Sequence, residues 1–390
     1  MELKNRERFL ENHPIHREKL HTAMKKAVDA TRKLAEKFTG EDFPSHYAKN
    51  FKYEHYKEFN WESGMLCGMF YIAYEYTKDE FFKEAAEKSI KVFMEHAETG
   101  EWLQNHDVGF IFSLSCVAGY KLTGDIKMRD AAIKAADILL SNYCPHNHFI
   151  IRSGKRDPEQ YDMYRTLVDS MMNIPLFFWA SEETGDNKYK DAAVAHYRTT
   201  MKYLIREDGS SFHHYQFDSV TLKPVKGLTF QGYSDESCWS RGHSWLVYGF
   251  PIAYSYTGNH ETIETHEKVS KFYLERLPKN NVPYWDLDFT DGSDEPRDSS
   301  AGAITACGFL EMCNYIDNDM KKTIFKNAAM MQIEAIIDTC PAPENADCII
   351  GKVSHAIPYD MGYEEGALYG DYFYMEALMR LLNPDFIRYW

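Results

Sequence analysis

The chain has 390 residues, of which 44% are hydrophobic and 15% aromatic, so it can bury a large core in one big domain or two ordinary ones. Its formal net charge of −15 argues against nucleic acids and anionic membrane surfaces as partners. If the substrate is itself an anion, a local basic pocket has to override this overall negative field.

Cysteine spacing and hydropathy narrow the class of protein further. None of the eight cysteines forms a CxxC pair, so the sequence indicates neither a zinc site nor a thioredoxin motif. The segment MELKNRERFLENHP is charged and lacks the apolar region of a signal peptide, and no run approaches the length of a membrane span. We therefore expect a cytoplasmic protein with reduced cysteines.

Helical periodicity begins early in the chain. Apolar residues recur at helical spacing from Leu20 to Phe38, and Gly40 ends the pattern. A second helix, apolar and aromatic, is predicted from Trp61 to Glu75. It ends at a turn whose type then recurs along the chain.

In each such turn a helix ends, the sequence T-K-D, T-G-D or T-G-N follows, and a new helix begins. The threonines of these turns are Thr77, Thr123, Thr184 and Thr257. Glycine in the left-handed conformation ends a helix, and Asp or Asn beside it caps the next one. The pattern is typical of repeated helical hairpins of irregular length.

The irregular length of the repeats decides between two helical architectures. An open solenoid needs a regular period and polar end caps. Irregular hairpins with apolar, aromatic inner helices predict instead an all-α closed toroid of about a dozen helices. No long Pro/Gly/Ser linker interrupts the chain, so we expect residues 1–390 to form a single domain.

Four stretches lack helical periodicity and concentrate His, Tyr, Trp, Asp and Gly: 146–161, 208–237, 282–300 and 341–362. Such segments are typical of binding loops that a rigid scaffold holds in place.

One carboxylate stands at the start of the apolar helix that follows His106-Asp107-Val108-Gly109-Phe110. Asp107 is a candidate helix cap. It is equally a candidate for chemistry, because the ends of inner helices meet in one cavity of a toroid. The sequence alone leaves both interpretations open.

The segment from Tyr161 to Asp186 is apolar around almost its whole circumference, which places it in the interior of a helical protein. Asp169 lies inside it, and a buried carboxylate has to be capped, paired or functionally retuned. Asp169 either caps the following helix or acts in catalysis, and both roles are compatible. If Asp107 lies nearby, the two carboxylates raise one pKa and prepare that group to donate a proton near neutral pH.

Two later segments and one earlier tryptophan supply candidate binding residues. His213 belongs to a His-His pair in a polar loop, where a histidine is free to act on a ligand. The segment from Gln231 to Trp245 places Trp239, Arg241 and Trp245 close together in sequence. Aromatic rings with one permanent positive charge suit a sugar face and a carboxylate. The alternatives are a structural ion pair for Arg241 and core packing for the tryptophans, and the same choice applies to Trp61.

These motifs resemble the unsaturated glucuronyl hydrolase family. The matching segments occur in order as HDVGF (106–110), LVDSMMNIPLFFWAS (167–181), IREDGSSFHHYQFD (205–218), QGYSDESCWSRGHSWLVYGF (231–250), DSSAGAITACGFLE (298–311) and YGDYFYMEALMRL (369–381). The resemblance implies an α6/α6 barrel, in agreement with the toroid inferred above. It also implies a substrate, namely an oligosaccharide left by a polysaccharide lyase with a C4=C5 unsaturated uronic acid at its non-reducing end.

The resemblance further implies hydration of a vinyl ether rather than direct displacement at the glycosidic bond. Asp169 takes the position of the general acid and base, and Asp107 that of the second carboxylate. The positions of residues that hold the unsaturated uronate fall on Trp61, His213, Gln231, Arg241 and Trp245, with Trp239 lining the same site. The family's chemistry calls for no metal, nucleotide or redox cofactor.

The chain departs from the family pattern at two places. Ile151-Arg152-Ser153-Gly154 stands where members commonly have a motif like AWG, so the tryptophan platform for the second sugar is absent. The loop from Ala356 to Met361 holds neither the serines nor the lysine of members that favour sulfated disaccharides. Lys352, Ser354, His355 and Arg152 are the remaining candidates for binding a sulfate.

Three other functions are compatible with parts of this pattern. An unsaturated rhamnogalacturonyl hydrolase shares the fold and the hydration chemistry. A conventional inverting glycosidase uses a carboxylate pair on saturated sugars. A non-catalytic helical sugar-binding protein would keep the tryptophans but has no need of Asp169 in a buried apolar segment. The sequence does not specify an oligomeric state.

Overall fold

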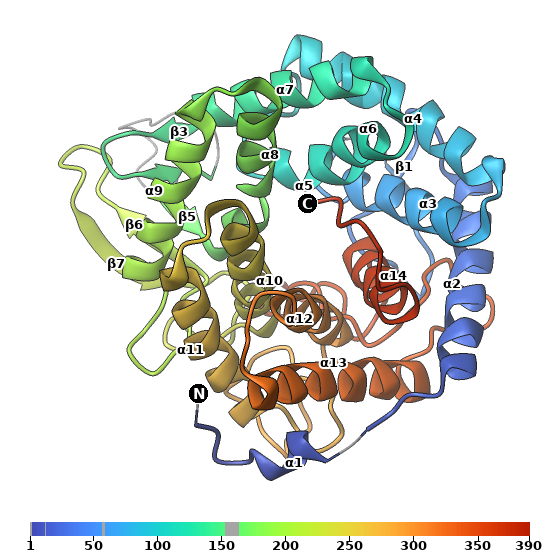
Figure 1. The fold of residues 1–390 in the computed structure, drawn as a ribbon, viewed down its shortest axis with the longest axis vertical. Coiled ribbons are helices and arrows are strands. Elements are labelled where there is room, and N and C mark those ends of the chain that lie inside the picture. Colours follow the sequence, from blue (N-terminus) through green and yellow to red (C-terminus); the bar gives the residue numbers. More distant parts are fainter. Residues whose placement is uncertain (1, 12, 57–58, 153–163) are drawn as a thin grey trace.

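Two concentric rings of helices make up the molecule (Figure 1). The structure is a computed structural model that describes residues 2–11, 13–56, 59–152 and 164–390. Outer and inner helices alternate along the chain, so each inner helix except the last is followed by an outer one in a helical hairpin. None of the described helices is long and apolar enough to cross a membrane.

The outer ring follows a short first helix, α1 (Glu7–Leu10), and its members carry buried residues along one face. They are α2 (Arg17–Lys37), α4 (Glu80–Thr99), α7 (Ile126–Ser141), α9 (Asn187–Tyr203), α11 (His260–Arg276) and α13 (Asp319–Thr339). In α2, for example, Leu20, Met24 and Ala27 are buried at helical spacing while the opposite face is exposed.

The inner ring consists of helices that are buried around almost their whole circumference. They are α3 (Ser63–Thr77), α5 (Val108–Phe112) with its π-helical continuation η1 (Ser113–Val117) and α6 (Ala118–Thr123), α8 (Pro175–Thr184), α10 (Ser240–Thr257), α12 (Ser299–Met312) and α14 (Leu368–Leu382). The ring closes because α14 packs against both α12 and α3, with α2 covering it from outside. The predicted closed toroid is therefore confirmed.

The recurring turns have the structure that their sequence predicts. At the second of them, the Thr123 hydroxyl donates to the carbonyl of Gly119 at 2.7 Å, and Gly124 ends the helix at φ +74°. The Asp125 side chain then accepts the N–H of Lys127 at 2.9 Å and caps α7. Lys78 takes the left-handed position at φ +60° in the one turn that lacks glycine.

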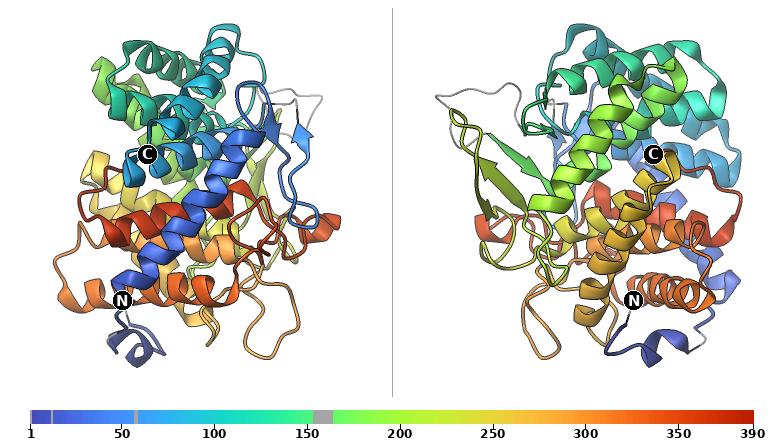
Figure 2. Two further views of the ribbon diagram at one scale, coloured as in Figure 1. Left: turned by 90° about the vertical axis from the view of Figure 1, so that its right-hand side faces the viewer. Right: turned by 60° about the vertical axis from the view of Figure 1, so that its left-hand side comes forward.

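Short strands lie between the helices, a feature that the all-α prediction did not include. They are β1 (Phe43–Pro44), β2 (His55–Tyr56), β3 (Tyr143–Cys144), β4 (Phe149–Ile150), β5 (Arg165–Leu167), β6 (His214–Phe217) and β7 (Pro224–Leu228). Of these, β4, β6 and β7 fall in the stretches without helical periodicity. The strands β5, β6 and β7 form an antiparallel sheet that projects from one side of the barrel (Figure 2). This sheet holds residue 213 beside residue 168, because the N–H of Val168 donates to the carbonyl of His213 at 3.0 Å.

The apolar segment from Tyr161 to Asp186 is not helical throughout. Its first three residues lie outside the described residues, β5 follows, and a 3-10 helix η3 (Val168–Met172) comes before α8. Pro175 begins α8, since its fixed φ and missing N–H suit the first helical turn. Asp169 thus lies in the 3-10 turn, one short element before the helix it was predicted to begin.

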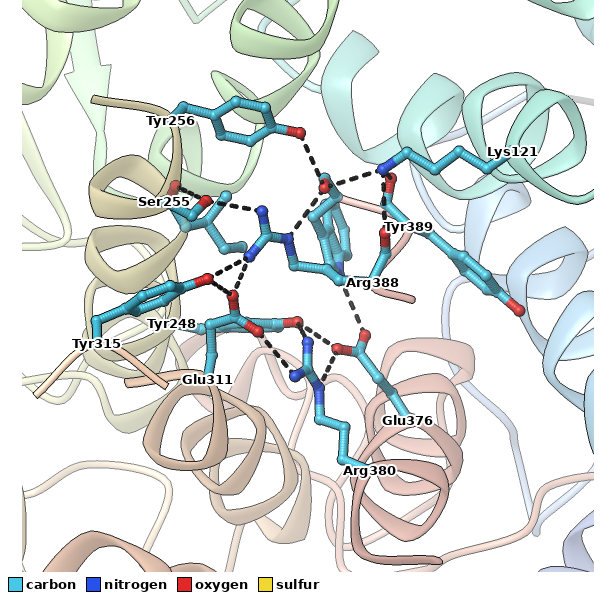
Figure 3. A network of polar contacts seen from close by, with 12 residues as sticks. Lys121, Tyr248, Ser255, Tyr256, Glu311, Tyr315, Glu376, Arg380, Arg388 and Tyr389 are labelled. Atoms are coloured by element: carbon cyan, nitrogen blue, oxygen red, sulfur yellow. Dashed lines mark hydrogen bonds and ion pairs between the residues drawn. The ribbon is translucent and has the colours of Figure 1, made fainter. Parts of the chain in front are cut away.

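One end of the barrel is closed by the segment that follows α14. Trp390 is 1% exposed and stacks on Phe373, with ring centroids 5.8 Å apart. A polar network holds this segment in place (Figure 3). In it Arg388 pairs with Glu311, and the Lys121 ammonium donates to the carbonyls of Arg388 and Tyr389 at 3.0 Å each.

Candidate active site

A cavity of about 480 Å³ brings all eight predicted site residues together. Its lining comes from the starts of α3, α5 and α10, from β5 and η3, and from the loops before α10 and α14. The eight residues are Trp61, Asp107, Asp169, His213, Gln231, Trp239, Arg241 and Trp245. The starts of inner helices therefore meet in one place, as the toroid predicts.

A larger cavity of about 720 Å³ lies at the closed end of the barrel. Three of its charged side chains bind one another, because Arg380 and Arg388 both pair with Glu311. The Arg380 guanidinium also pairs with Glu376 at 2.9 Å. The smaller cavity is the better candidate for chemistry, since its carboxylates are not paired in this way.

Asp169 does not cap a helix in this structure. It lies in the first turn of η3, which has no side-chain cap, and its Oδ2 atom is buried without a hydrogen-bond partner. Burial raises the pKa of Asp169 to about 6, and Asp107 adds to the increase by its negative charge. His106 and Arg241 act in the opposite direction. About half of Asp169 therefore carries a proton at pH 6, and about a tenth at pH 7, far more than for an ordinary aspartate.

Asp107 occupies the N-cap position of α5, yet its side chain makes no capping hydrogen bond. Its Oδ1 atom lies 3.2 Å from Nε2 of His106. The other ring nitrogen of His106 donates to the carbonyl of Arg152 at 3.0 Å, which fixes the orientation of the imidazole. The capping interpretation fails for both aspartates, and both carboxylates line the cavity.

His213 presents an N–H group to Asp169. Its Nδ1 atom accepts from the backbone N–H of Phe230 at 3.2 Å and of Gln231 at 3.4 Å, so in the neutral ring the proton is on Nε2. Nε2 is buried without a hydrogen-bond partner and lies 3.9 Å from Oδ2 of Asp169. Burial, with His214 and Arg241 nearby, holds the pKa of His213 well below its usual range, so the ring is neutral.

The tryptophans are at once core residues and part of the cavity wall. Trp245 is 1% exposed, and its Nε1–H is buried without a partner. Trp61 is less buried and stacks on Tyr369, with ring centroids 5.2 Å apart and planes inclined by 16°. Phe110 packs against both, at 5.2 Å from each ring. Their burial agrees with the core interpretation, while the binding role of these tryptophans stays a prediction that their place in the wall permits.

Arg241 makes the structural ion pair that was one of its two predicted roles. It is buried between the rings of Trp239 and Tyr369, each centroid 4.6 Å from its guanidinium carbon. One Nη atom bonds Asp298 at 2.9 Å, and the guanidinium also donates to the carbonyls of Ser354 and His355 at 2.6 Å each. Since a guanidinium has five N–H donors, these bonds leave donors for a ligand.

Several cavity residues were not among the eight predicted site residues. They are His46, His106, Arg165, Leu167 and Phe230, the two sulfate candidates Arg152 and His355, and the loop residues Ala356, Tyr359 and Met361. Strand periodicity would have identified Arg165 and Leu167, because they alternate with Asp169 along the chain and all three line the cavity. No comparable signal marks His46, whose Nδ1 atom lies 3.0 Å from the buried Glu62 carboxylate. With Arg241, the arginines provide the local positive charge that an anionic substrate needs.

The two places where the chain departs from its family pattern both touch the cavity. Arg152 lines the wall, while Ser153 and Gly154 lie outside the described residues. In the loop before α14, Tyr359 and Met361 line the cavity, but Asp360 is exposed and is not part of the wall.

Comparisons with known proteins agree with this geometry. The unsaturated chondroitin disaccharide hydrolase of Streptococcus pneumoniae is 38% identical over all of this chain and 98% of its own length. The crystal structure of unsaturated glucuronyl hydrolase from Streptococcus agalactiae superposes with a TM-score of 0.95 at 35% identity, covering all of this chain and 98% of that one. A mutant of the same enzyme in complex with dGlcA-GalNAc6S gives a TM-score of 0.87 at 34% identity, again over all of this chain and 98% of that one.

The family model described as Glycosyl Hydrolase Family 88 matches residues 34–380. This range begins in α2 and ends in α14, so it contains both rings of the barrel and every residue of the cavity wall. The chain belongs to Glycosyl Hydrolase Family 88 and is an enzyme of the glycosidase class, which confirms the resemblance found in its sequence.

Proposed function

We propose that the protein releases the C4=C5 unsaturated uronic acid from the non-reducing end of lyase-generated glycosaminoglycan disaccharides by hydrating the double bond. The observation that carries the proposal is the Asp169 carboxyl group, whose Oδ2 atom is buried and unpartnered and whose pKa is raised to about 6. The names of its relatives from Streptococcus support the same class of substrate.

In the proposed reaction, protonated Asp169 transfers its proton to C4 of the unsaturated sugar. Positive charge then develops at C5 and on the ring oxygen, and a water molecule adds to C5. The Asp169 carboxylate, now ionised, accepts the proton that this water loses, so the residue is restored at the end of the step. Raising the pKa of a carboxyl group towards the working pH is what this double role requires.

The product of hydration is a hemiketal at C5, which breaks down without further help. Its bond between C5 and the ring oxygen breaks, giving a ketone at C5 and a hemiacetal at C1. The hemiacetal then expels the second sugar and leaves an aldehyde at C1. One water molecule is consumed overall, and the released acid is a keto acid.

The remaining residues of the cavity would hold the unsaturated sugar. The unpartnered N–H groups of His213 and Trp245 are available as donors to its oxygen atoms. Asp107 would accept hydrogen bonds from sugar hydroxyls and keep the pKa of Asp169 high. Trp61 and Trp239 contribute aromatic surface, while Gln231 is anchored to the carbonyl of His355 at 2.9 Å.

The C6 carboxylate of the uronate provides a test of Arg241. We expect a substrate whose carboxylate is reduced to an alcohol to react about 10- to 100-fold more slowly in kcat/KM, because a charge-assisted hydrogen bond contributes about 1.5–3 kcal/mol. The rates of both substrates are compared on the wild type and on Arg241→Lys. Equal rates on acid and alcohol would remove Arg241 from this role and leave it the ion pair with Asp298.

Loss of ultraviolet absorbance tests the proposed function directly, because the conjugated unsaturated uronate absorbs and its hydration product does not. The protein is incubated with a lyase-generated disaccharide and with its saturated counterpart. Turnover of the unsaturated sugar alone supports hydration. Cleavage of the saturated one points to a conventional glycosidase, binding without turnover to a sugar-binding protein, and preference for an unsaturated rhamnogalacturonyl disaccharide to that sister class.

Sulfation of the second sugar gives a further prediction. A sulfate needs local donors to replace its hydration, and the wall residues Ala356, Tyr359 and Met361 offer no charged side chain. We expect an unsulfated unsaturated disaccharide to have a higher kcat/KM than its 6-sulfated counterpart. A clear preference for the sulfated sugar would assign the missing donor to Arg152 or His355, which line the same cavity.

Two further proposals concern the chain as a whole. We propose that residues 1–390 form one catalytic domain, because α2, the first long helix of the chain, packs against α14, the last one. We also propose a cytoplasmic location, because all eight cysteines are free thiols, which suits a reducing compartment. Cell fractionation tests the second proposal.

A further inference from the structure

The first turn of α5 is capped by a residue from another part of the chain. The first N–H groups of a helix have no partner within it, and an aspartate at the N-cap normally accepts the N–H of the third helical residue. Asp107 holds that N-cap position without making the bond. The third N–H of α5, that of Phe110, donates instead to Oδ1 of Asn173 at 2.8 Å.

The same asparagine is bonded to the turn that holds Asp169. Its Nδ2 group donates to the backbone carbonyl of Asp169 at 3.2 Å, and its own N–H donates to the carbonyl of Ser170 at 3.0 Å. Asn173 is completely buried. One side chain therefore bonds the element that carries Asp107 and the element that carries Asp169.

A glycine makes this close approach possible. A Cβ atom added at Gly109 would lie 2.2 Å from the carbonyl oxygen of Asn173 and 2.3 Å from its Cα. The two backbones are thus in direct contact. Gly109 lies two residues after Asp107, and Asn173 lies four residues after Asp169. Any side chain at position 109 would push the two elements apart.

We propose that Asn173 is a positioning residue for the two carboxylates: by capping α5 in place of Asp107, it leaves the Asp107 side chain free to face the cavity beside Asp169. This inference rests on the proposed roles of Asp107 and Asp169. It explains why Asp107, in the position of a helix cap, makes no capping bond. A capped α5 and an Asp107 carboxylate that stays at the cavity beside His106 are both obtained, because the acceptor comes from a different element.

Removal of the Asn173 side chain has a specific consequence for Asp107. In Asn173→Ala the buried N–H of Phe110 loses its acceptor, which is costly, and the N-cap carboxylate of Asp107 is the acceptor that helix geometry favours. Asp107 then turns towards its own helix and away from Asp169. The other groups that act on Asp169 are His106, Arg241 and the neutral His213. None of them replaces the lost negative charge, so the pKa of Asp169 falls.

The test compares pH profiles of kcat/KM for the wild type, Asn173→Ala, Asp107→Asn and the double variant. We expect Asn173→Ala to lower kcat by about 10²-fold, the scale of a small misplacement of reacting groups. We also expect its alkaline limb to move to lower pH, in the same direction as that of Asp107→Asn. The double variant should be no less active than Asp107→Asn, since both substitutions remove the same effect, namely the action of the Asp107 charge on Asp169.

Asn327→Ala is the matched control. Asn327 is also a buried asparagine whose Nδ2 group bonds backbone carbonyls, those of Phe9 and Glu11, but it lies outside the cavity. This variant should lower the melting temperature and leave the pH profile unchanged. The position of the limb does not depend on how much of a sample is folded, so a partly unfolded Asn173→Ala preparation still gives an answer.

A second variant restores the cap. Asn173→Asp keeps an acceptor for the N–H of Phe110, and burial favours its neutral, protonated form, which can still donate to the carbonyl of Asp169, so its alkaline limb should stay close to that of the wild type. An unshifted limb in Asn173→Ala, or a loss of activity that adds to that of Asp107→Asn, would overturn the positioning role. Full turnover by Asp169→Asn would instead overturn the catalytic assignment on which the inference rests.

Discussion

Replacement of Asp169 by asparagine is expected to lower kcat by about 10²- to 10⁴-fold while substrate binding is largely retained. General acid and base groups contribute on this scale, and asparagine keeps the shape of the side chain but cannot donate a proton to C4. The folded protein should tolerate the substitution, because the buried site of Oδ2 already disfavours an ionised carboxyl group, and asparagine places a neutral amide there. Turnover is followed by the loss of ultraviolet absorbance, and binding by calorimetry with an unsaturated disaccharide.

The control for this variant is Asp360→Asn. Asp360 is an exposed carboxylate in the loop before α14, close in sequence to Tyr359 and Met361 of the wall but not part of it. It should leave kcat and KM unchanged. Normal turnover by Asp169→Asn, with substrate still bound, would contradict the role of Asp169 as the acid.

The second large effect is expected for Asp107→Asn, which should reduce kcat and also shift the pH profile. Asp107 helps to raise the pKa of Asp169, so its neutralisation lowers that pKa from about 6. A general acid acts in its protonated form, and activity therefore falls as the pH rises through the pKa of Asp169. The alkaline limb of kcat/KM should move to lower pH, and the enzyme should lose most activity in the neutral range.

This shift is measured with one substrate from about pH 4 to 8, a range that covers both the ordinary and the raised pKa values of aspartate side chains. Asp298→Asn is unsuitable as a control, because Asp298 pairs with the buried Arg241. Asp235→Asn is suitable, since Asp235 is exposed and does not line the cavity. A profile that is lower but unshifted would show that Asp107 acts on the substrate without tuning Asp169.

The fold was predictable where its signals are local. Thr123, Gly124 and Asp125 each bond within a few residues of themselves, so their order in the sequence determines the turn. The same holds for the apolar inner helices, whose composition alone requires burial. The small sheet of β5, β6 and β7 was not predicted, because its strands are short and β5 pairs with β6 across about 50 residues of sequence.

The site was predictable in its membership but not in its bonds. Asp107 and Asp169 stand out because a carboxylate next to an apolar helix needs an explanation. The partner of Arg241 is 57 residues away, and the partner of the Phe110 N–H is 63 residues away. Such pairs depend on which helix ends meet in the folded ring. The structure excludes the capping role of Asp107, because Asn173 takes that role, and the catalytic role stays a prediction.

The closed end of the barrel has a consequence for the order of events in one turnover. Within the described part of the chain, Trp390 stacks on Phe373 behind the floor that Phe110 and Trp245 form, so this side offers no exit from the cavity. For the proposed reaction, substrate and both products would then pass through the same mouth. A chain would enter with its terminal sugar first, which would restrict attack to that sugar. We expect the sugar nearer the mouth to leave first and the keto acid last, so the keto acid should be a competitive product inhibitor.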